Sequence, residues 1–528
     1  MSNNPIISKK LFVINSASSA ATKVIQTSVM VWLYSYLLKR ISVEEYSLLP
    51  VVMAVMAFFP LLTMVLTAGQ SRFIMDAFAR QDERRITEIV STMFPVLIMA
   101  TIVILLLGSI LIVYIDVALT IPPSRVTDAR FMLSLLIFSA SAQLLLSPFG
   151  TGFYVHQKFV FQNIIVLGSE LLRIAILFAL LFGVSARVLW VVVALVSASL
   201  VKLIVQNIIS RRLVPALKFC RSAIDWASMK ELVFYNLWSF LRQVAGTVRT
   251  GLHPIILNKF ARSIDVVCYQ LGTMPYRQSL QGMNIIMQPI IPVAIIMHST
   301  GRPDRLRNLY FRGGRIELWI SMFIVGPCMI FSQEIVSLWV GPDFAVAATV
   351  MTIVLMELPL EYGNSMLGHL IYAKGNLAGY VKRIVFLNGV DLALVLFMVG
   401  ALQKGALGIA VATAGSRIAG QLLLLWPLGL KIAGATFSGF LKNTLVPGLL
   451  PFFTASIVWI GIKYLFVPSS WLGLGVGVVC GMCCYILVFL VFSVLPEDRD
   501  DLKRAGNMLR IKLSTLRSGT ITSAVSKK

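Results

Sequence analysis

Residues 43–93 decide the fold, and they read VEEYSLLPVVMAVMAFFPLLTMVLTAGQSRFIMDAFARQDERRITEIVSTM. The apolar run from Ser47 to Ser71 is long enough to cross a bilayer, since a spanning helix needs about 20 mostly apolar residues. A short loop rich in Asp, Glu and Arg follows, and a second apolar run begins near Glu88. Spans alternating with short charged loops are typical of a polytopic membrane protein.

The whole chain has the composition that this alternation requires. Of its 528 residues, 58% are hydrophobic and only 13% are charged, and its mean hydropathy is +0.85. These values are typical of membrane proteins and exclude an ordinary soluble domain. We expect fourteen spans, at residues 11–38, 47–71, 88–115, 131–154, 159–183, 188–210, 232–258, 266–298, 316–333, 345–372, 384–400, 405–430, 444–466 and 471–495.

The charged loop of residues 79–86, ARQDERRI, recurs as TGRPDRLRNL at residues 300–309. Its Arg, Asp and Arg reappear 222 positions later. Two span motifs recur in nearly the same register: Tyr46-x-Leu48 matches Tyr269-x-Leu271, and Gly168-x-Glu170 matches Gly389-x-Asp391. This shift carries the second span onto the eighth and the fifth onto the eleventh, which indicates a duplicated unit of six helices.

An even number of spans keeps both copies in one orientation, as in a parallel repeat about an axis along the membrane normal. We therefore predict an all-α protein of two six-helix lobes and two appended helices. The lobes are residues 1–212 and 231–432, joined by a basic cytoplasmic linker at 213–230. The appended helices occupy 433–495, and a basic cytoplasmic tail occupies 496–528. Such repeats place the substrate between the lobes and rock one lobe against the other.

The net charge of +23 follows the positive-inside rule, because the basic segments fall between spans on one side. This distribution puts both termini in the cytoplasm and gives no reason to expect a nucleic-acid partner. The tail has a leucine face flanked by Lys and Arg, which is typical of a segment on anionic membrane lipids. The six cysteines lack metal-ligand spacing, so we expect neither a metal nor a cofactor.

Basic residues inside the predicted spans are the strongest functional signal. Each charge at the centre of a span costs roughly 2.5–3.5 kcal/mol, so a wet cavity for an anionic ligand is the expected reason to keep them. Four lie deep in the second half of the chain: Arg242, Arg249, Arg277 and Arg417. The structural alternative is that polar side chains hydrogen-bond neighbouring helices as packing contacts.

Other side chains are expected to share this cationic cavity. Gln281 and Asn284 lie on the same predicted helix face as Arg277. Lys23 lies beside a polar strip in the first span. Guanidinium groups next to amides suit phosphate oxygens and sugar hydroxyls.

Acidic residues also occur inside the predicted spans. Glu357 and Glu361 are one helical turn apart, and two close carboxylates in a low dielectric hold a proton or recruit a cation. They and Asp391 are candidates for coupling to H⁺ or Na⁺, although they could equally neutralise the arginines. Glu170 is a weaker candidate, because Arg173 is three residues away and can pair with it.

The stretch of residues 43–93 resembles the first-lobe signature of bacterial polysaccharide repeat-unit flippases of the multidrug/oligosaccharidyl-lipid/polysaccharide exporter superfamily. The resemblance rests on Tyr46, Gly69, Arg72-Phe73-Ile74 and Asp82-Glu83-Arg84, and residues 257–295 are similar to the family's second-lobe region. It implies a V-shaped transporter and not an enzyme. That transporter would flip a polyprenyl-pyrophosphate-linked (undecaprenyl-linked) oligosaccharide across the bacterial inner membrane by alternating access, for O-antigen, capsule or exopolysaccharide synthesis. Glycan polymerase and chain-length proteins are the implied partners, and Arg242, Arg249, Arg277 and Arg417 would hold pyrophosphate or acidic sugars.

Three alternatives remain open from the sequence. A multidrug antiporter of the same fold is the first, although the first span has Lys23 where drug exporters often have a carboxylate, and a cationic cavity repels cationic drugs. A lipid II flippase is the second, because fourteen spans also occur there. A membrane glycan polymerase or glycosyltransferase is the third, but the outer loops are short for such an enzyme.

Overall fold

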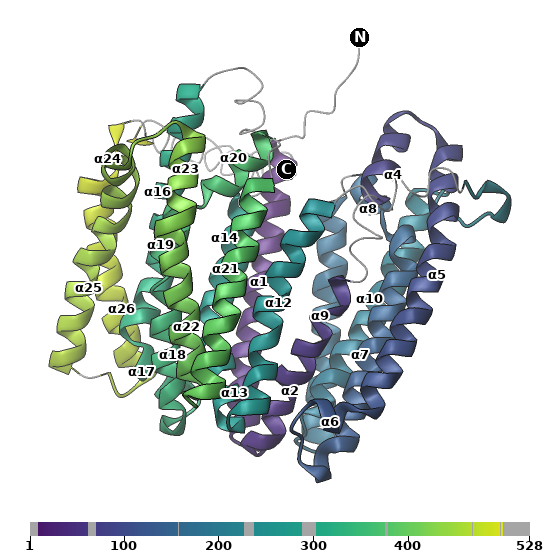
Figure 1. Cartoon of the computed structure of the whole chain (residues 1–528), viewed down its shortest axis with the longest axis horizontal. Helices are drawn as coiled ribbons and strands as arrows, with labels where there is room; N and C mark the ends of the chain where they lie inside the picture. The colour runs from purple at the N-terminus through teal and green to yellow at the C-terminus, as the bar shows by residue number, and fades with distance from the viewer. Residues whose placement is uncertain are drawn as a thin grey trace, which may run out of the picture.

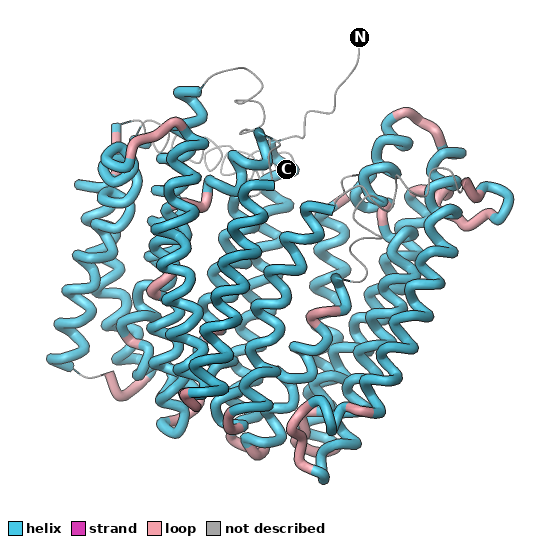
Figure 2. The backbone as a smooth tube through the Cα atoms, in the orientation of Figure 1, coloured by secondary structure: helices cyan, strands magenta, loops and turns pink. Residues whose placement is uncertain are grey.

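The computed structural model describes residues 9–61, 70–156, 158–225, 237–287, 303–374, 378–466, 468–496 and 498–499. Helices make up nearly all of this described part, and no strand occurs in it (Figure 2). Eleven of its helices are long and apolar enough to cross a membrane. The expected spans at 11–38 and 232–258 are helical wherever they are described, whereas the expected span at 266–298 is divided at Thr273 into two helices. The all-α membrane fold is confirmed.

The N-terminal helices follow the predicted spans closely. They are α1 (Lys9–Leu38), α2 (Val43–Met56), α4 (Gln70–Ala79), α5 (Glu83–Val113), α6 (Ile115–Ala118), α7 (Val126–Leu146), α8 (Gly152–Val155), α9 (Phe159–Gly183) and α10 (Leu189–Leu213). Capping side chains fix two of the starts. Ser42 accepts a hydrogen bond from the backbone of Glu45 at the start of α2, and Asp82 does the same for Arg85 at α5.

The C-terminal helices are more often interrupted. They are α12 (Leu237–Phe260), α13 (Ser263–Gly272), α14 (Met274–Met287), α16 (Pro303–Ile330), α17 (Ser332–Trp339), α18 (Ala345–Leu355), α19 (Leu358–Gly363), α20 (Met366–Lys374), α21 (Ala378–Leu396), α22 (Gly405–Gly420), α23 (Trp426–Ala433), α24 (Phe437–Phe440), α25 (Val446–Phe466) and α26 (Trp471–Val488). Four π-helical segments extend or join them: η5 (Phe397–Ala401), η6 (Gln421–Leu425), η7 (Leu441–Leu445) and η8 (Phe489–Ser493).

The order of the helices is consistent with the predicted duplication. A shift near 222 carries α5 onto α16, α9 onto α21 and α10 onto α22. In each half the corresponding neighbours pack together, α9 on α10 and α21 on α22. The ribbons form two groups, α4 to α10 and α12 to α26, with α2 crossing between them (Figure 1).

Helix α1 lies between the two groups. It packs against α9 of the N-terminal group and α14 of the C-terminal group, and in Figure 1 it runs beside the C-terminal helices. The first helix therefore forms part of the seam between the lobes.

The long helices begin and end at two opposite faces of the molecule. At the terminal face, α1 and α16 begin and η8 ends; at the opposite face, α12 ends and α13 and α26 begin (Figure 1). The ribbons of the two groups diverge toward the terminal face. At the opposite face, α2 packs on α12 and α13.

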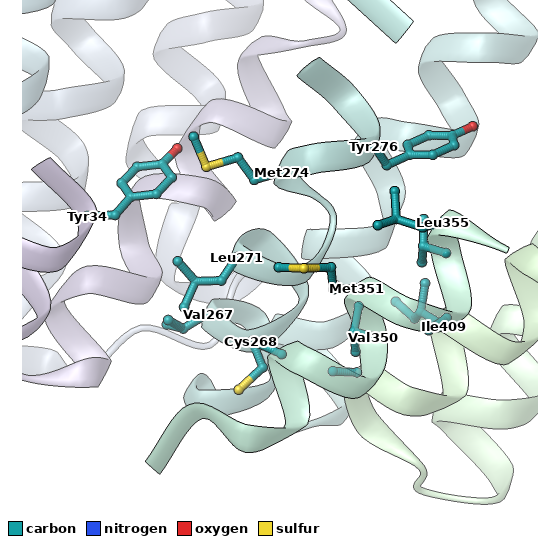
Figure 3. Packing of buried hydrophobic residues seen from close by; sticks show 14 of the residues in the cluster. Tyr34, Val267, Cys268, Leu271, Met274, Tyr276, Val350, Met351, Leu355 and Ile409 are labelled. Carbon is teal, nitrogen blue, oxygen red and sulfur yellow. The ribbon is translucent and has the colours of Figure 1, made fainter. Parts of the chain in front are cut away.

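Short helix α13 is the centre of the apolar core. It packs on α2 and α18, and its Val267, Cys268 and Leu271 are buried in that core (Figure 3). The approach to α18 depends on Gly272, because a Cβ there would lie 2.6 Å from the carbonyl oxygen of Ala347. Only glycine lets these backbones pack so closely without a shift.

Candidate functional site

The candidate site is the polar interior of the C-terminal helices, and interruptions in those helices shape it. The predicted span at 345–372 is three helices, α18, α19 and α20, because the chain turns at Glu357 and again at Asn364. Pro359 lies in the first turn of α19, where its missing N–H is tolerated. Glu357 and Glu361 remain one turn apart, joined by a backbone hydrogen bond of 3.1 Å.

Four helices meet at a buried histidine. His253 of α12 shares a 2.6 Å hydrogen bond through Nδ1 with the hydroxyl of Tyr269 on α13. Its Nε2 lies 3.4 Å from Oδ2 of Asp391 on α21. Asp391 Oδ1 accepts a 2.9 Å hydrogen bond from Ser416 on α22. His253 and Asp391 are almost completely buried, so any proton on this pair is shielded from bulk water.

Arg417 of α22 lies half-buried beside these groups. Its Nε is buried and has no hydrogen-bond partner within the described part of the chain. The carboxylates that interact with it electrostatically are Glu361, Glu357 and Asp391, and the hydroxyl of Tyr276 is also near. The acids near α19 and α21 thus offset the charge of Arg417.

Between α14 and helices α16, α19 and α20 the interior opens into a polar cavity of about 330 Å³. Glu317 accepts a 2.6 Å hydrogen bond from Ser365 at its wall. Tyr310 donates to Asn364 Oδ1 at 2.7 Å, and Asn364 Nδ2 donates to Gln421 Oε1 at 3.3 Å. These contacts fix the polar groups before any ligand enters.

The seam between α1 and α14 brings together three of the predicted residues. Lys23 donates a hydrogen bond to Gln281, and Thr27 donates to Gln278 at 3.2 Å. On the same helix as these glutamines, Arg277 donates to Gln270 Oε1 at 3.0 Å and to its backbone oxygen at 2.9 Å. Lys23, Gln281 and Arg277 therefore border the seam. Asn284 lies on a different face of α14 and lines the polar cavity.

Other predicted residues have separate positions. The side chains of Arg242 and Arg249 lie outside the described residues, although both are on α12. Glu170 pairs with Arg173, three residues along α9, and both are buried in the N-terminal group. The predicted pairing is confirmed, and Glu170 stands apart from the C-terminal acids.

One group that the sequence reasoning missed joins the two lobes at the opposite face. Asn258, near the end of α12, accepts a 2.8 Å hydrogen bond from the backbone N–H of Thr120 and donates a 3.0 Å bond to its carbonyl. Lys259 approaches the carbonyl of Val117 at 3.4 Å. Together with the contacts of α1, these hydrogen bonds join the two lobes. An asparagine closing an apolar run, as here in ILNKF, is the sequence signal that could have marked them.

The comparisons with known proteins agree with this geometry. A family model described as polysaccharide biosynthesis protein matches residues 13–297, more than half of the chain. The chain belongs to the polysaccharide biosynthesis protein family. The resemblance expected from residues 43–93 is therefore confirmed, and the family is one of membrane proteins for glycan synthesis.

A relative and two solved structures extend the likeness beyond residue 297. An uncharacterized membrane protein of Bacillus subtilis (strain 168), EpsK, is 20% identical over 507 residues, covering 93% of this chain and 98% of EpsK. Lipid II flippase MurJ in an inward closed conformation has a TM-score of 0.64 at 14% identity, covering 91% of this chain and 98% of MurJ. An inward-facing multidrug MATE transporter of the MOP superfamily has a TM-score of 0.62 at 11% identity, covering 80% and 94%. This family member thus has the multi-pass fold of flippases and multidrug transporters.

Proposed function

We propose that the protein flips a polyprenyl-pyrophosphate-linked oligosaccharide across the bacterial inner membrane by alternating access, for the assembly of a surface polysaccharide. One combined observation supports the proposal. The chain belongs to a family of polysaccharide biosynthesis proteins, and its two groups of helices are joined by hydrogen bonds at the opposite face. The proposed orientation places the terminal face in the cytoplasm. The lipid-linked glycan would enter there, and glycan polymerase and chain-length proteins would act on the exported units.

The proposed headgroup site lies at the seam and the adjoining interior. Lys23 and Arg277 border the seam between α1 and α14, and Arg417 has a buried Nε without a hydrogen-bond partner in the described part. A pyrophosphate can bridge such groups, because guanidinium donors bind phosphate oxygens in pairs. Arg242 and Arg249 on α12 belong to the same proposal through their positions on that helix.

The test is export of lipid-linked glycan by arginine variants in cells that lack their own flippase. We expect Arg417→Ala and Arg277→Ala to reduce surface glycan by about tenfold or more, since a lost charged hydrogen bond costs roughly 1.5–3 kcal/mol. Arg84→Ala is the matched control, because that side chain is 91% exposed. Normal export by both interior variants, at equal protein levels in the membrane, contradicts the proposed headgroup site.

We further propose that Asp391, with Glu357 and Glu361, couples transport to H⁺ or Na⁺. The support is the almost complete burial of Asp391 and of His253, whose Nε2 lies 3.4 Å from Asp391 Oδ2. In proteoliposomes, Asp391→Asn should abolish the response of transport to an imposed ion gradient. Exchange of substrate in the absence of a gradient should remain. Ser134→Ala is the control, since that hydroxyl bonds only its own helix, at 2.7 Å to Arg130 O. An unchanged gradient response in the Asp391 variant refutes the coupling role.

A second function is favoured by a different observation, the acids that surround Arg417. Carboxylates in a membrane interior suit cationic drugs, so a multidrug antiporter is the alternative, and the likeness to the MATE transporter points the same way. The likeness to MurJ keeps lipid II as an alternative substrate. Sensitivity to cationic dyes with normal surface glycan in a deletion strain favours the antiporter. Rescue of a strain depleted of its lipid II flippase favours lipid II.

A further inference from the structure

The polar cavity of the C-terminal helices has the size of a site for one small polar molecule. Its volume of about 330 Å³ is at the lower end of the range of about 300–1,000 Å³ that is usual for ligand sites. That is room for one sugar ring and too little for an oligosaccharide. The cavity is bordered by α14, which also forms the seam with α1.

The wall of this cavity offers many hydrogen-bonding groups on rigid elements. Its buried base holds Glu317, Asn364 and Gln421, and its more open rim holds Asn284 and His369. Gln421 begins the π-helical segment η6, and Leu425 at the other end of η6 also lines the cavity. π-helical turns inside α-helices occur frequently at functional sites. The rings of Tyr362 and Tyr380, which also line the cavity, add flat apolar surface.

The charge of the wall limits what it can accept. Two carboxylates, Glu317 and Glu361, line the cavity, and the described lining residues include no Lys or Arg. A ligand carboxylate would meet Glu361 at this wall, whereas Arg417, which offsets Glu361 in the interior, is not among the described lining residues, so binding of an acidic sugar is disfavoured. The described residues also contain no group of three acidic, His or Cys side chains that could hold a metal ion.

We propose that this cavity binds one sugar of the transported glycan, and that the sugar is neutral or carries an amino or N-acetylamino group. Carboxylate and amide oxygens accept hydrogen bonds from its hydroxyl and N–H groups, and the tyrosine rings cover its apolar face. The inference rests on the proposed flippase function. The sequence predicted that the arginines hold pyrophosphate or acidic sugars. That prediction concerns the arginine positions and not this cavity.

A variant that fills the cavity with an apolar side chain tests whether a sugar binds there, and it changes no polar group. Gly368 lines the cavity, and a Cβ built there meets no atom within 4 Å, so Gly368→Leu projects into the open space. Gly415→Leu is the matched control, because its Cβ is equally free and its residue is exposed on α22. Saturation-transfer NMR on the protein in nanodiscs would use free N-acetylglucosamine, glucose and glucuronate as probes. We expect signal from the first two and none from glucuronate, a loss of about tenfold in Gly368→Leu, and no loss in the control.

A charge variant tests the sugar class and does not depend on filling the cavity. Glu361→Gln keeps the acceptor for the Tyr276 hydroxyl, which lies 3.3 Å away, and removes one negative charge. Glucuronate binding should then rise by about tenfold or more relative to that of glucose. Glucuronate binding to the wild type as strong as that of glucose overturns the assignment. Unchanged probe binding in a folded Gly368→Leu protein overturns it as well.

The failure of this inference is distinguishable from the failure of the flippase proposal. Wild-type protein that flips lipid-linked glycan, together with a Gly368→Leu variant that flips it equally well, contradicts the cavity alone. Wild-type protein that does not flip lipid-linked glycan contradicts the proposed function whatever the NMR probes show.

Discussion

The contact between Asn258 and Thr120 gives a quantitative prediction about the balance between the two transporter states. Asn258→Ala removes two hydrogen bonds, of 2.8 and 3.0 Å, that join the lobes at the opposite face. Each bond contributes about 0.5–1.5 kcal/mol net, and water can replace the side chain at Thr120 because that residue is exposed. We therefore expect the joined state to lose about 1–2 kcal/mol, which is a factor of about 5–30 in population.

Electron paramagnetic resonance measurements of the distance between two spin labels can detect this change in population. Spin labels at Tyr114 and Arg262, both exposed near the opposite face, would be placed in a variant without the six native cysteines. Asn258→Ala should increase the fraction of long distances. Asn207→Ala is the control, because its Nδ2 bonds Leu203 O within α10 at 2.8 Å and crosses no lobe boundary. The reasoning is refuted if the distance distribution of Asn258→Ala matches that of the wild type.

Three further predictions test packing, charge and topology. Gly272→Ala should destabilise the protein by about 1–3 kcal/mol, because its Cβ would lie 2.6 Å from the Ala347 carbonyl. Thermal unfolding checks this against Gly475→Ala, whose Cβ meets open space; equal midpoints would contradict the close approach. Asp498→Asn should cost about 3–5 kcal/mol, since buried Asp498 pairs with Arg312 at 2.7 Å and with buried Arg315, whereas exposed Asp304→Asn should have little effect on the unfolding midpoint. The hydrogen bond to Ser222 lowers the pKa of the Cys220 thiol, so its thiolate fraction at neutral pH is raised. An impermeant maleimide added to intact cells should leave Cys220 unlabelled and should label it after lysis; labelling in intact cells would overturn the proposed topology.

Much of the fold follows from local sequence. Hydropathy locates the spans because each must supply about 20 apolar residues to the bilayer core. The pair Glu170–Arg173 was predictable because i, i+3 side chains meet on any helix. The adjacency of Glu357 and Glu361 was predictable for the same reason.

The candidate site depended on contacts that local spacing does not contain. His253 and Asp391 lie on helices separated by more than a hundred residues, so no spacing within one helix predicts that they meet. The sequence left open whether Glu357, Glu361 and Asp391 couple to an ion or neutralise the arginines, and the structure places all three near Arg417. The breaks at Glu357 and Asn364 fix which side chains face the cavity, and a hydropathy pattern averages over such turns.

The central claim is that this family member moves a lipid-linked glycan between leaflets. Its most direct test is purified protein in liposomes that contain a polyprenyl-pyrophosphate-linked oligosaccharide, with an impermeant glycan-cleaving enzyme added outside. The wild type should make both leaflets accessible, and Arg417→Ala should slow this by about tenfold or more. Protection of the inner-leaflet glycan with wild-type protein, at the level of empty liposomes, would contradict the claim.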